Sequence, residues 1–152
     1  MNWQQLRDSI YYLDGSLRDI YVLNTTKDDW IIWADFVNQN YPVKIHNEDN
    51  KLIDTKVDLT GVFDCWAVNE HSGLSAIVLV DNVIVQSYFF SDQEIENDIS
   101  PIEVNSMYDH IKLVDYMIGL SKALNKKVIL SPENESETEL IKVYNNEVTI
   151  LL

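Results

Sequence analysis

Apolar residues recur at three- and four-residue spacing in three segments of the chain, and this spacing predicts three helices. The first segment covers residues 2 to 13. The second begins after Thr25 and Thr26, the two candidate N-caps, and ends before Pro42, which cannot continue a helix. The third covers residues 106 to 124 and is the longest. We expect the second and third helices to be the two major helices of the fold.

The long segment 106 to 124 has the features of a helix packed into the body of a domain. Asn105 and Ser106 are both suitable N-cap residues at its start. Its apolar residues cover a wide arc rather than a narrow stripe, which is typical of a helix with much of its surface covered. We expect Ile111, Val114 and Ile118 to face the core.

Apolar alternation and short continuous apolar runs predict the strands of a sheet. Asp81-Asn82 and Asn145-Asn146-Glu147 each separate two such runs, and both connectors suit tight hairpins. The predicted strands are residues 17 to 23, 62 to 68, 74 to 80, 83 to 90, 126 to 130, 140 to 144 and 148 to 152.

The order of these elements favours one α+β domain. Strands come mostly in runs, and helices cluster at the front and before the last strands, which predicts a mainly antiparallel sheet of about five or six strands with two or three packed helices. The chain has 152 residues and no linker-like or low-complexity segment, so we expect a single domain covering residues 1 to 152.

Two stretches of the chain place a carboxylate at every second residue. If a stretch is extended, its four carboxylates point to the same side of the strand, where like charges repel. Such a ladder becomes useful when a basic surface docks on it. The first acidic stretch is Asp92, Glu94, Glu96 and Asp98, and the second is Glu133, Glu135, Glu137 and Glu139.

The overall charge has the same sign as these stretches. The chain carries 25 Asp and Glu residues against 11 Lys and Arg, for a formal net charge of −14. Binding to nucleic acid or to anionic membrane needs clusters of cations, so both are disfavoured and a basic protein is the complementary partner. The alternative is that the charge only keeps the protein soluble.

The expected location of the protein is the cytoplasm. No apolar run approaches the roughly 20 residues needed to span a bilayer, and the start of the chain lacks the pattern of a secretion signal. Cys65 is the single cysteine, which excludes an internal disulfide framework.

Cys65 is also the first candidate for chemistry, since three histidines could partner it. It lies in the predicted strand 62 to 68, where a lone cysteine is usually a small buried apolar residue. We therefore expect a buried, unreactive thiol rather than a nucleophile.

The remaining signals for chemistry are weak, and we expect no catalytic residue, no metal and no cofactor. The chain has no paired His or Cys at metal-ligand spacing and no Gly-rich phosphate loop. Asp115 would be of interest if it faced the core, where burial would raise its pKa. We interpret it instead as a boundary residue of the long helix.

Aromatic residues supply a second kind of candidate binding surface. Trp30 and Trp33 lie on one face of the second predicted helix, and Trp is favoured as an anchor at protein interfaces. We expect them to contribute to partner binding together with the two acidic stretches.

Parts of the chain resemble a known family. Leu17-Arg18-Asp19-Ile20-Tyr21-Val22 and Thr25-Thr26-Lys27-Asp28-Asp29-Trp30 are similar to the opening of small acidic immunity proteins of bacterial polymorphic toxin systems. Ser106-Met107-Tyr108-Asp109-His110, leading to Asn125-Lys126-Lys127-Val128, is similar to their later helix-strand portion. The resemblance covers about a third of the chain. It implies a non-enzymatic inhibitor that binds a cognate toxin domain, often a basic one.

The sequence therefore predicts a non-enzymatic acidic protein that neutralises a basic protein partner. The alternatives are a small hydrolase or transferase that uses Cys65 or a buried carboxylate, and a regulatory or scaffold subunit. An enzyme needs a concave pocket with convergent groups, whereas an inhibitor needs an exposed acidic and aromatic patch.

Overall fold

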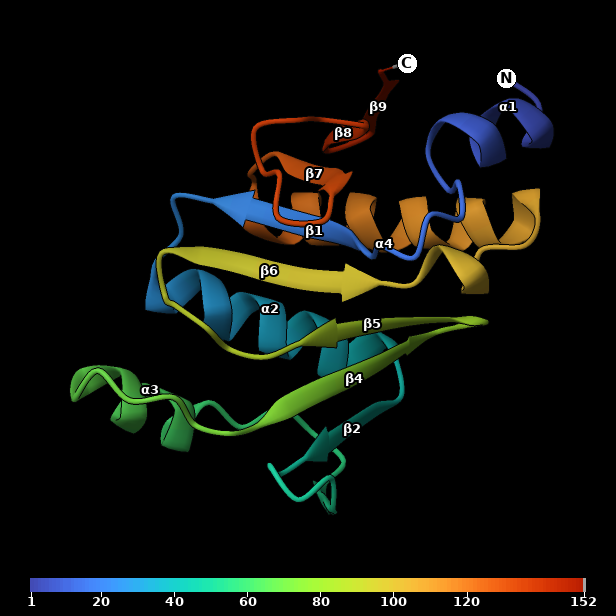
Figure 1. The fold of residues 1–152 in the computed structure, drawn as a ribbon. Coiled ribbons are helices and arrows are strands. Elements are labelled where there is room, and N and C mark those ends of the chain that lie inside the picture. The colour runs from blue at the N-terminus through green and yellow to red at the C-terminus, as the bar shows by residue number, and fades with distance from the viewer. Residues whose placement is uncertain (152) are drawn as a thin grey trace.

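The fold is a nine-stranded antiparallel sheet with helices on one of its faces (Figure 1). It is described from a computed structural model that covers residues 1 to 151. The strand order is β3-β2-β4-β5-β6-β1-β7-β8-β9. The predicted α+β class is confirmed, but the sheet has more strands than the five or six expected, and there are four α-helices within residues 1 to 151.

The helices and strands have the following bounds. The helices are α1 (Trp3–Ser9), α2 (Lys27–Asn40), α3 (Thr60–Ala67) and α4 (Met107–Leu124), with one 3-10 turn at Pro101–Glu103. The strands are β1 (Arg18–Leu23), β2 (Val43–His46), β3 (Leu52–Asp54), β4 (Ser75–Val80), β5 (Val83–Ser87), β6 (Glu94–Ile99), β7 (Val128–Pro132), β8 (Ile141–Tyr144) and β9 (Glu147–Ile150).

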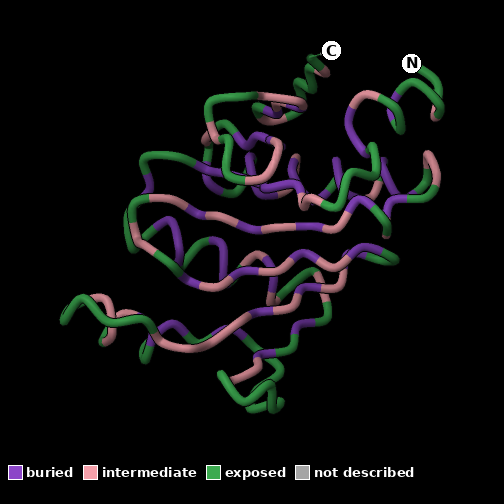
Figure 2. Tube along the Cα trace, viewed as in Figure 1, coloured by how far each residue is buried: buried purple, intermediate pink, exposed green. Residues whose placement is uncertain are grey.

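The two faces of the sheet differ in how they are covered. Helices α2 and α4 lie behind the sheet in Figure 1, and no helix lies in front of β4, β5 and β6. Burial alternates along these three strands, so that every second residue is buried against the helices and the others are only half-buried (Figure 2). We call the side away from α2 and α4 the open face.

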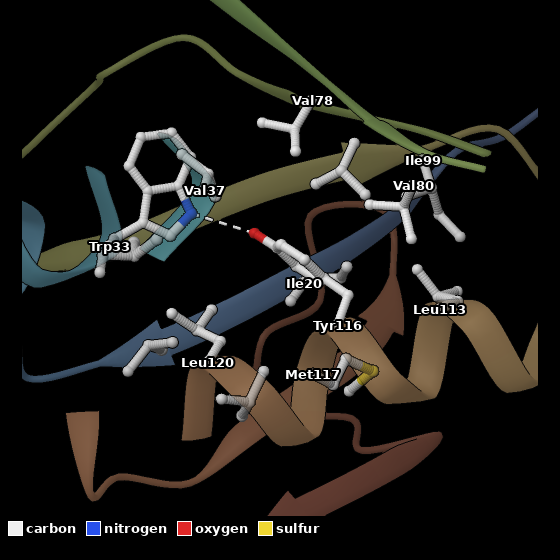
Figure 3. Close-up of a cluster of buried hydrophobic side chains, with 14 of the residues drawn as sticks. Ile20, Trp33, Val37, Val78, Val80, Ile99, Leu113, Tyr116, Met117 and Leu120 are labelled. Carbon is white, nitrogen blue, oxygen red and sulfur yellow. Dashed lines mark hydrogen bonds between the residues drawn. The ribbon is translucent and has the colours of Figure 1, made fainter. Parts of the chain in front are cut away.

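The core lies between the sheet and the two long helices (Figure 3). From α4, Leu113, Tyr116, Met117 and Leu120 are fully buried. The expectation that Ile111 faces the core is wrong, because its side chain is 48% exposed. The apolar arc of α4 is wide enough to leave its inward direction ambiguous in the sequence, and the buried face is centred on Tyr116 instead.

Trp30 and Trp33 are core residues, so the expectation that they form a binding surface is wrong. Both side chains are almost fully buried, and their rings contact Phe89. The Trp33 Nε1–H donates to the Tyr116 hydroxyl (3.0 Å), which in turn donates to Asn97 Oδ1 (2.5 Å). This buried chain of hydrogen bonds joins α2, α4 and β6 and satisfies their polar atoms inside the core.

The prediction of a strand at residues 62 to 68 is wrong, and three strands of the sheet were not predicted. The segment predicted as strand 62 to 68 is helix α3, since Val62 and Trp66 are one helical turn apart and both turn inward toward the core. Asn69, with a positive φ of 57°, follows the end of this helix. Strands β2, β3 and β6 were not predicted because they are short or rich in polar residues.

Candidate functional site

The open face carries a group of carboxylates that comes from three elements. On β6, Glu94, Glu96 and Asp98 all point to the open face, while Ile95 and Ile99 are buried against the helices. The first acidic stretch is therefore extended over these three carboxylates, as expected for a ladder. Asp92 belongs to the same stretch but precedes the strand and lies in the loop before it.

Strand β1 adds one more carboxylate beside this ladder. Asp19 pairs with Asp98 across the β1–β6 ladder, and the register continues with Tyr21 opposite Glu96. Paired residues of neighbouring strands share a face of the sheet, so Asp19 lies next to the β6 carboxylates. Sequence reasoning missed Asp19 as a site residue. The sequence did predict this strand, and the alternation of faces along it places Asp19 on the same side as Tyr21.

The second acidic stretch does not form a ladder, so that expectation is wrong. Pro132 ends β7, and Asn134, with a positive φ of 62°, begins a turn. Glu133 and Glu139 each have a partner within the fold. Glu133 Oε1 accepts a hydrogen bond from the Leu17 N–H (2.7 Å), and Glu139 forms a salt bridge with Lys127. The other two members, Glu135 and Glu137, are exposed in the turns.

The turn after β7 nevertheless brings one carboxylate to the open face. The Asn134 N–H donates to Asp19 Oδ2 (2.7 Å), which fixes this loop against β1, and the loop passes in front of β1 in Figure 1. Burial raises the pKa of Asp19, and the charge of the nearby Glu133 raises it further. We use the term acidic face for five residues: Asp19, Glu94, Glu96, Asp98 and Glu133.

The carboxylates of the acidic face lack a counter-charge. Burial, followed by the charges of Asp19 and the neighbouring carboxylates, raises the pKa of Glu96 to about 7, and burial and Asp19 raise that of Asp98 to about 6. Within residues 1 to 151, none of the five carboxylates forms a salt bridge. Crowded like charges without cations are a cost to the fold.

An unpaired hydroxyl adjoins the acidic face. Ser131 on β7 pairs with Asp19 across the β1–β7 ladder and therefore points to the same face. Its Oγ is fully buried and has no hydrogen-bond partner among the residues described. Buried polar atoms are nearly always paired, so this unpaired hydroxyl is a further cost to the fold beside Asp19.

Aromatic side chains border the acidic face on both sides. The Tyr21 hydroxyl donates to Asp19 Oδ2 (2.9 Å). On the other side, burial and the charges of Asp98 and Glu96 raise the pKa of Tyr88. The ring of Phe90 stacks on Tyr88 and is 56% exposed. Tyr21 itself is buried, so Phe90 and the half-buried Tyr88, rather than Trp30 and Trp33, supply the accessible aromatic surface next to the carboxylates.

The raised pKa of Glu96 predicts an unusual pH dependence of stability. The folded protein keeps a proton on Glu96 between pH 4.5, its ordinary pKa, and about 7, so stability is present below this window and is lost as pH rises through it. Because Glu96 is only partly buried, solvent reduces the effect, and we expect Glu96 to contribute about 1 kcal/mol more stability at about pH 5 than at about pH 7.5.

Urea unfolding at the two pH values measures this difference. Glu96→Gln should remove much of it, because the amide does not titrate. Glu135→Gln, a change at an exposed carboxylate in the turn after β7, serves as the matched control and should leave it in place. Burial lowers the pKa of His110, which contributes stability of the opposite sign over part of this range, so the test is the difference between wild type and variant. A Glu96→Gln protein with the same pH dependence as the wild type would contradict the electrostatic description of the acidic face.

The candidates for catalysis are not brought together. Cys65 lies in helix α3 rather than in a strand and is only half-buried, so the expectation of a buried strand cysteine is wrong. Among the described residues, Cys65 has no hydrogen bond to a histidine; the His110 Nδ1 pairs with the Tyr11 hydroxyl (2.7 Å). Asp115 is exposed on α4, as expected for a boundary residue.

A cavity of about 500 Å³ lies between α2 and α3. It is lined by Ile31, Phe63 and several carboxylates, among them Asp54 and Asp58. Asp54 Oδ1 and Asp58 Oδ1 accept hydrogen bonds from backbone N–H groups one or two residues further on. They therefore stabilise turns in the loop before α3, and they do not converge with a histidine or Cys65.

Two further features are absent within residues 1 to 151. No group of three or more His, Cys, Asp or Glu residues is arranged to hold a metal ion. No helix is both long and apolar enough to cross a membrane.

The comparisons with known proteins give no family. The chain matches no family model, and no curated protein or solved structure matches it either.

Proposed function

We propose that this chain is a non-enzymatic binding protein that neutralises a basic protein partner, such as a cognate toxin domain, in the cytoplasm. The observation that carries the proposal is the acidic face: carboxylates from β1, β6 and the loop after β7 are gathered on the uncovered side of the sheet without a cation. Lys and Arg side chains of a partner would supply the missing counter-charge.

The surroundings of the acidic face also suit a protein partner. On β4 and β5, Ile77, Leu79 and Ile84 are half-buried on the same open face. Gln86 pairs with Asp98 and connects this apolar half to the carboxylates. An apolar patch bordered by charge and exposed aromatic rings has the composition of a protein interface.

Charge on this face would act mainly on the rate of association. A negative potential attracts a basic partner before contact and raises the association rate constant, whereas the short contacts formed afterwards set the dissociation rate. The effect weakens as the salt concentration rises and the Debye length falls below about 10 Å.

The test begins with the partner. The product of a gene next to this one, and any basic protein retained by the immobilised chain from its native cytoplasm, should be purified and its binding followed at low and high salt. We expect Glu96→Gln/Asp98→Asn to lower the association rate constant about tenfold at low salt, with a smaller effect at high salt.

Two matched variants separate the acidic face from net charge. Asp35→Asn/Asp115→Asn makes the same change of charge on exposed residues of α2 and α4, on the other side of the sheet. Glu135→Gln/Glu137→Gln makes it in the turns after β7. Equal effects of all three pairs would show that only the total charge matters, and the proposal for this face would fail.

A further inference from the structure

A second hollow lies on the open face, directly beside the carboxylates. Its volume is about 380 Å³, and its walls include Tyr21 and Leu23 from β1, Ile129 from β7 and Tyr144 from β8. These strands are neighbours in the sheet (Figure 1). The apolar parts of the four side chains form the interior of the hollow, which has room for a large side chain.

The rim of the hollow contains two lysines, but their charges are compensated. Lys126 Nζ contacts Asp29 Oδ2 (2.9 Å) and donates to the Asn24 carbonyl (2.8 Å). Lys127 Nζ contacts Glu139 Oε1 (3.2 Å). Since each ammonium group already has a carboxylate, the rim is close to neutral and does not repel a basic partner.

The hollow and the acidic face are joined through β1. Leu23 pairs with Glu94 and Tyr21 pairs with Glu96 across the β1–β6 ladder, and neighbouring strands are about 4.8 Å apart. Tyr21 belongs to both features, because its ring lines the hollow and its hydroxyl donates to Asp19. One short segment of a partner can therefore reach both.

We infer that this hollow is the anchor site of the interface, and that it receives an aromatic or long aliphatic side chain that lies next to lysine or arginine residues in the basic partner. The inference rests on the proposed function and makes it more specific. Charge complementarity at Glu94 and Glu96 selects a basic segment, and the apolar walls select a bulky side chain within it. Interfaces commonly derive most of their affinity from such an anchor in a pocket.

Two synthetic peptides test the anchor site without knowledge of the partner: acetyl-Lys-Lys-Phe-Lys-Lys-amide and the same peptide with Ala in place of Phe. Binding to the 15N-labelled full chain is followed by NMR titration. We expect the Phe peptide to bind about tenfold more tightly than the Ala peptide, since burial of an apolar side chain stabilises the complex. The largest shifts should fall at Leu23, Ile129 and Tyr144.

Variants of the hollow should remove this preference. Leu23 and Tyr144 are 37% and 45% exposed, so Leu23→Gln and Tyr144→Ser should keep the fold and should bring the two peptides to within about twofold of each other. Val148→Gln is the matched control: Val148 is 39% exposed on β9 and does not line the hollow. It should leave the tenfold preference intact.

The outcomes distinguish the anchor site from the acidic face. Equal binding of both peptides to the wild type, or a Phe preference that survives in both Leu23→Gln and Tyr144→Ser, overturns the anchor site. Glu96→Gln/Asp98→Asn should weaken both peptides equally and preserve their ratio. If that double variant changes neither affinity, the acidic face fails while the hollow stands as an apolar site.

Discussion

Replacing Arg18 with methionine should lower the free energy of unfolding by about 3 kcal/mol, the largest effect that we expect from a single substitution. Arg18 begins β1 and is fully buried. Its Nε donates to the Ile10 carbonyl (2.8 Å), one terminal nitrogen donates to the Tyr12 carbonyl (2.6 Å), and the other donates to Ser16 Oγ and the Leu17 carbonyl (2.9 Å each).

These bonds hold the loop between α1 and β1. Methionine would fill much of the space but would leave the buried Ile10 carbonyl and the part-buried Tyr12 and Leu17 carbonyls without this donor, and an unpaired buried polar group costs about 1–3 kcal/mol. The guanidinium also lies over the Tyr12 ring, 4.1 Å from its centre. Lysine at position 18 could replace the charge but not the planar arrangement of donors, so Arg18→Lys should be intermediate.

Urea unfolding measures the effect, and Arg7→Met is the control because Arg7 is exposed on α1. A loss below about 1 kcal/mol for Arg18→Met would show that the loop is held by other contacts. The position matters for the proposed function as well, since Asp19 of the acidic face and Tyr21, whose hydroxyl donates to Asp19, follow Arg18 on the same strand.

Sequence reasoning correctly identified those elements whose signal lies within a few neighbouring residues of the chain. The hairpin between β4 and β5 follows from Asp81-Asn82, and Asp81 does adopt a positive φ of 52°. Helix α4 begins after Ser106, whose side chain accepts from the Asp109 N–H. In both places the same residues that suggest the structure also make the hydrogen bonds or adopt the backbone angles that form it.

Strand β6 was missed because its polar residues concealed a regular alternation. Ile95 and Ile99 face the helices, and Asn97 between them is buried with its amide bonded to the Tyr116 hydroxyl. Asparagine is typical of loops in a sequence, and the hydrogen bond that allows Asn97 to be buried in a strand comes from a distant helix. The first acidic stretch therefore has a structural cause: its carboxylates occupy the open side of a central strand.

The acidic face could be predicted only in part for a similar reason. The carboxylates of β6 share a face by alternation alone, which the sequence shows. Asp19 joins them through strand pairing, and Glu133 joins them through a turn, and neither relation is visible in a single sequence. Trp30 and Trp33 were misplaced because amphipathic patterning does not tell which side of an aromatic-rich helix is buried.

Charge reversal on the acidic face should separate binding from folding. In Glu96→Lys/Asp98→Lys, two ammonium groups take the place of crowded carboxylates and lie beside Asp19, whose charge repels those of Asp98 and Glu96 in the wild type. The stability at neutral pH should therefore hold or rise. Toward a basic partner, the same groups place like charges across the interface, which costs several kcal/mol.

We expect the affinity of this double variant for its basic partner to fall at least about 100-fold, equivalent to about 2.7 kcal/mol. Titration calorimetry of the purified pair gives the affinity, and urea unfolding of the free chain gives the stability. Asp35→Lys/Asp115→Lys, with an identical change in net charge on exposed residues of α2 and α4, should reduce the affinity no more than about threefold, because distant charges are screened. Loss of binding in both variants would place the interface elsewhere or reduce it to overall charge, whereas loss in the first alone, with an intact fold, assigns partner binding to the open face of the sheet.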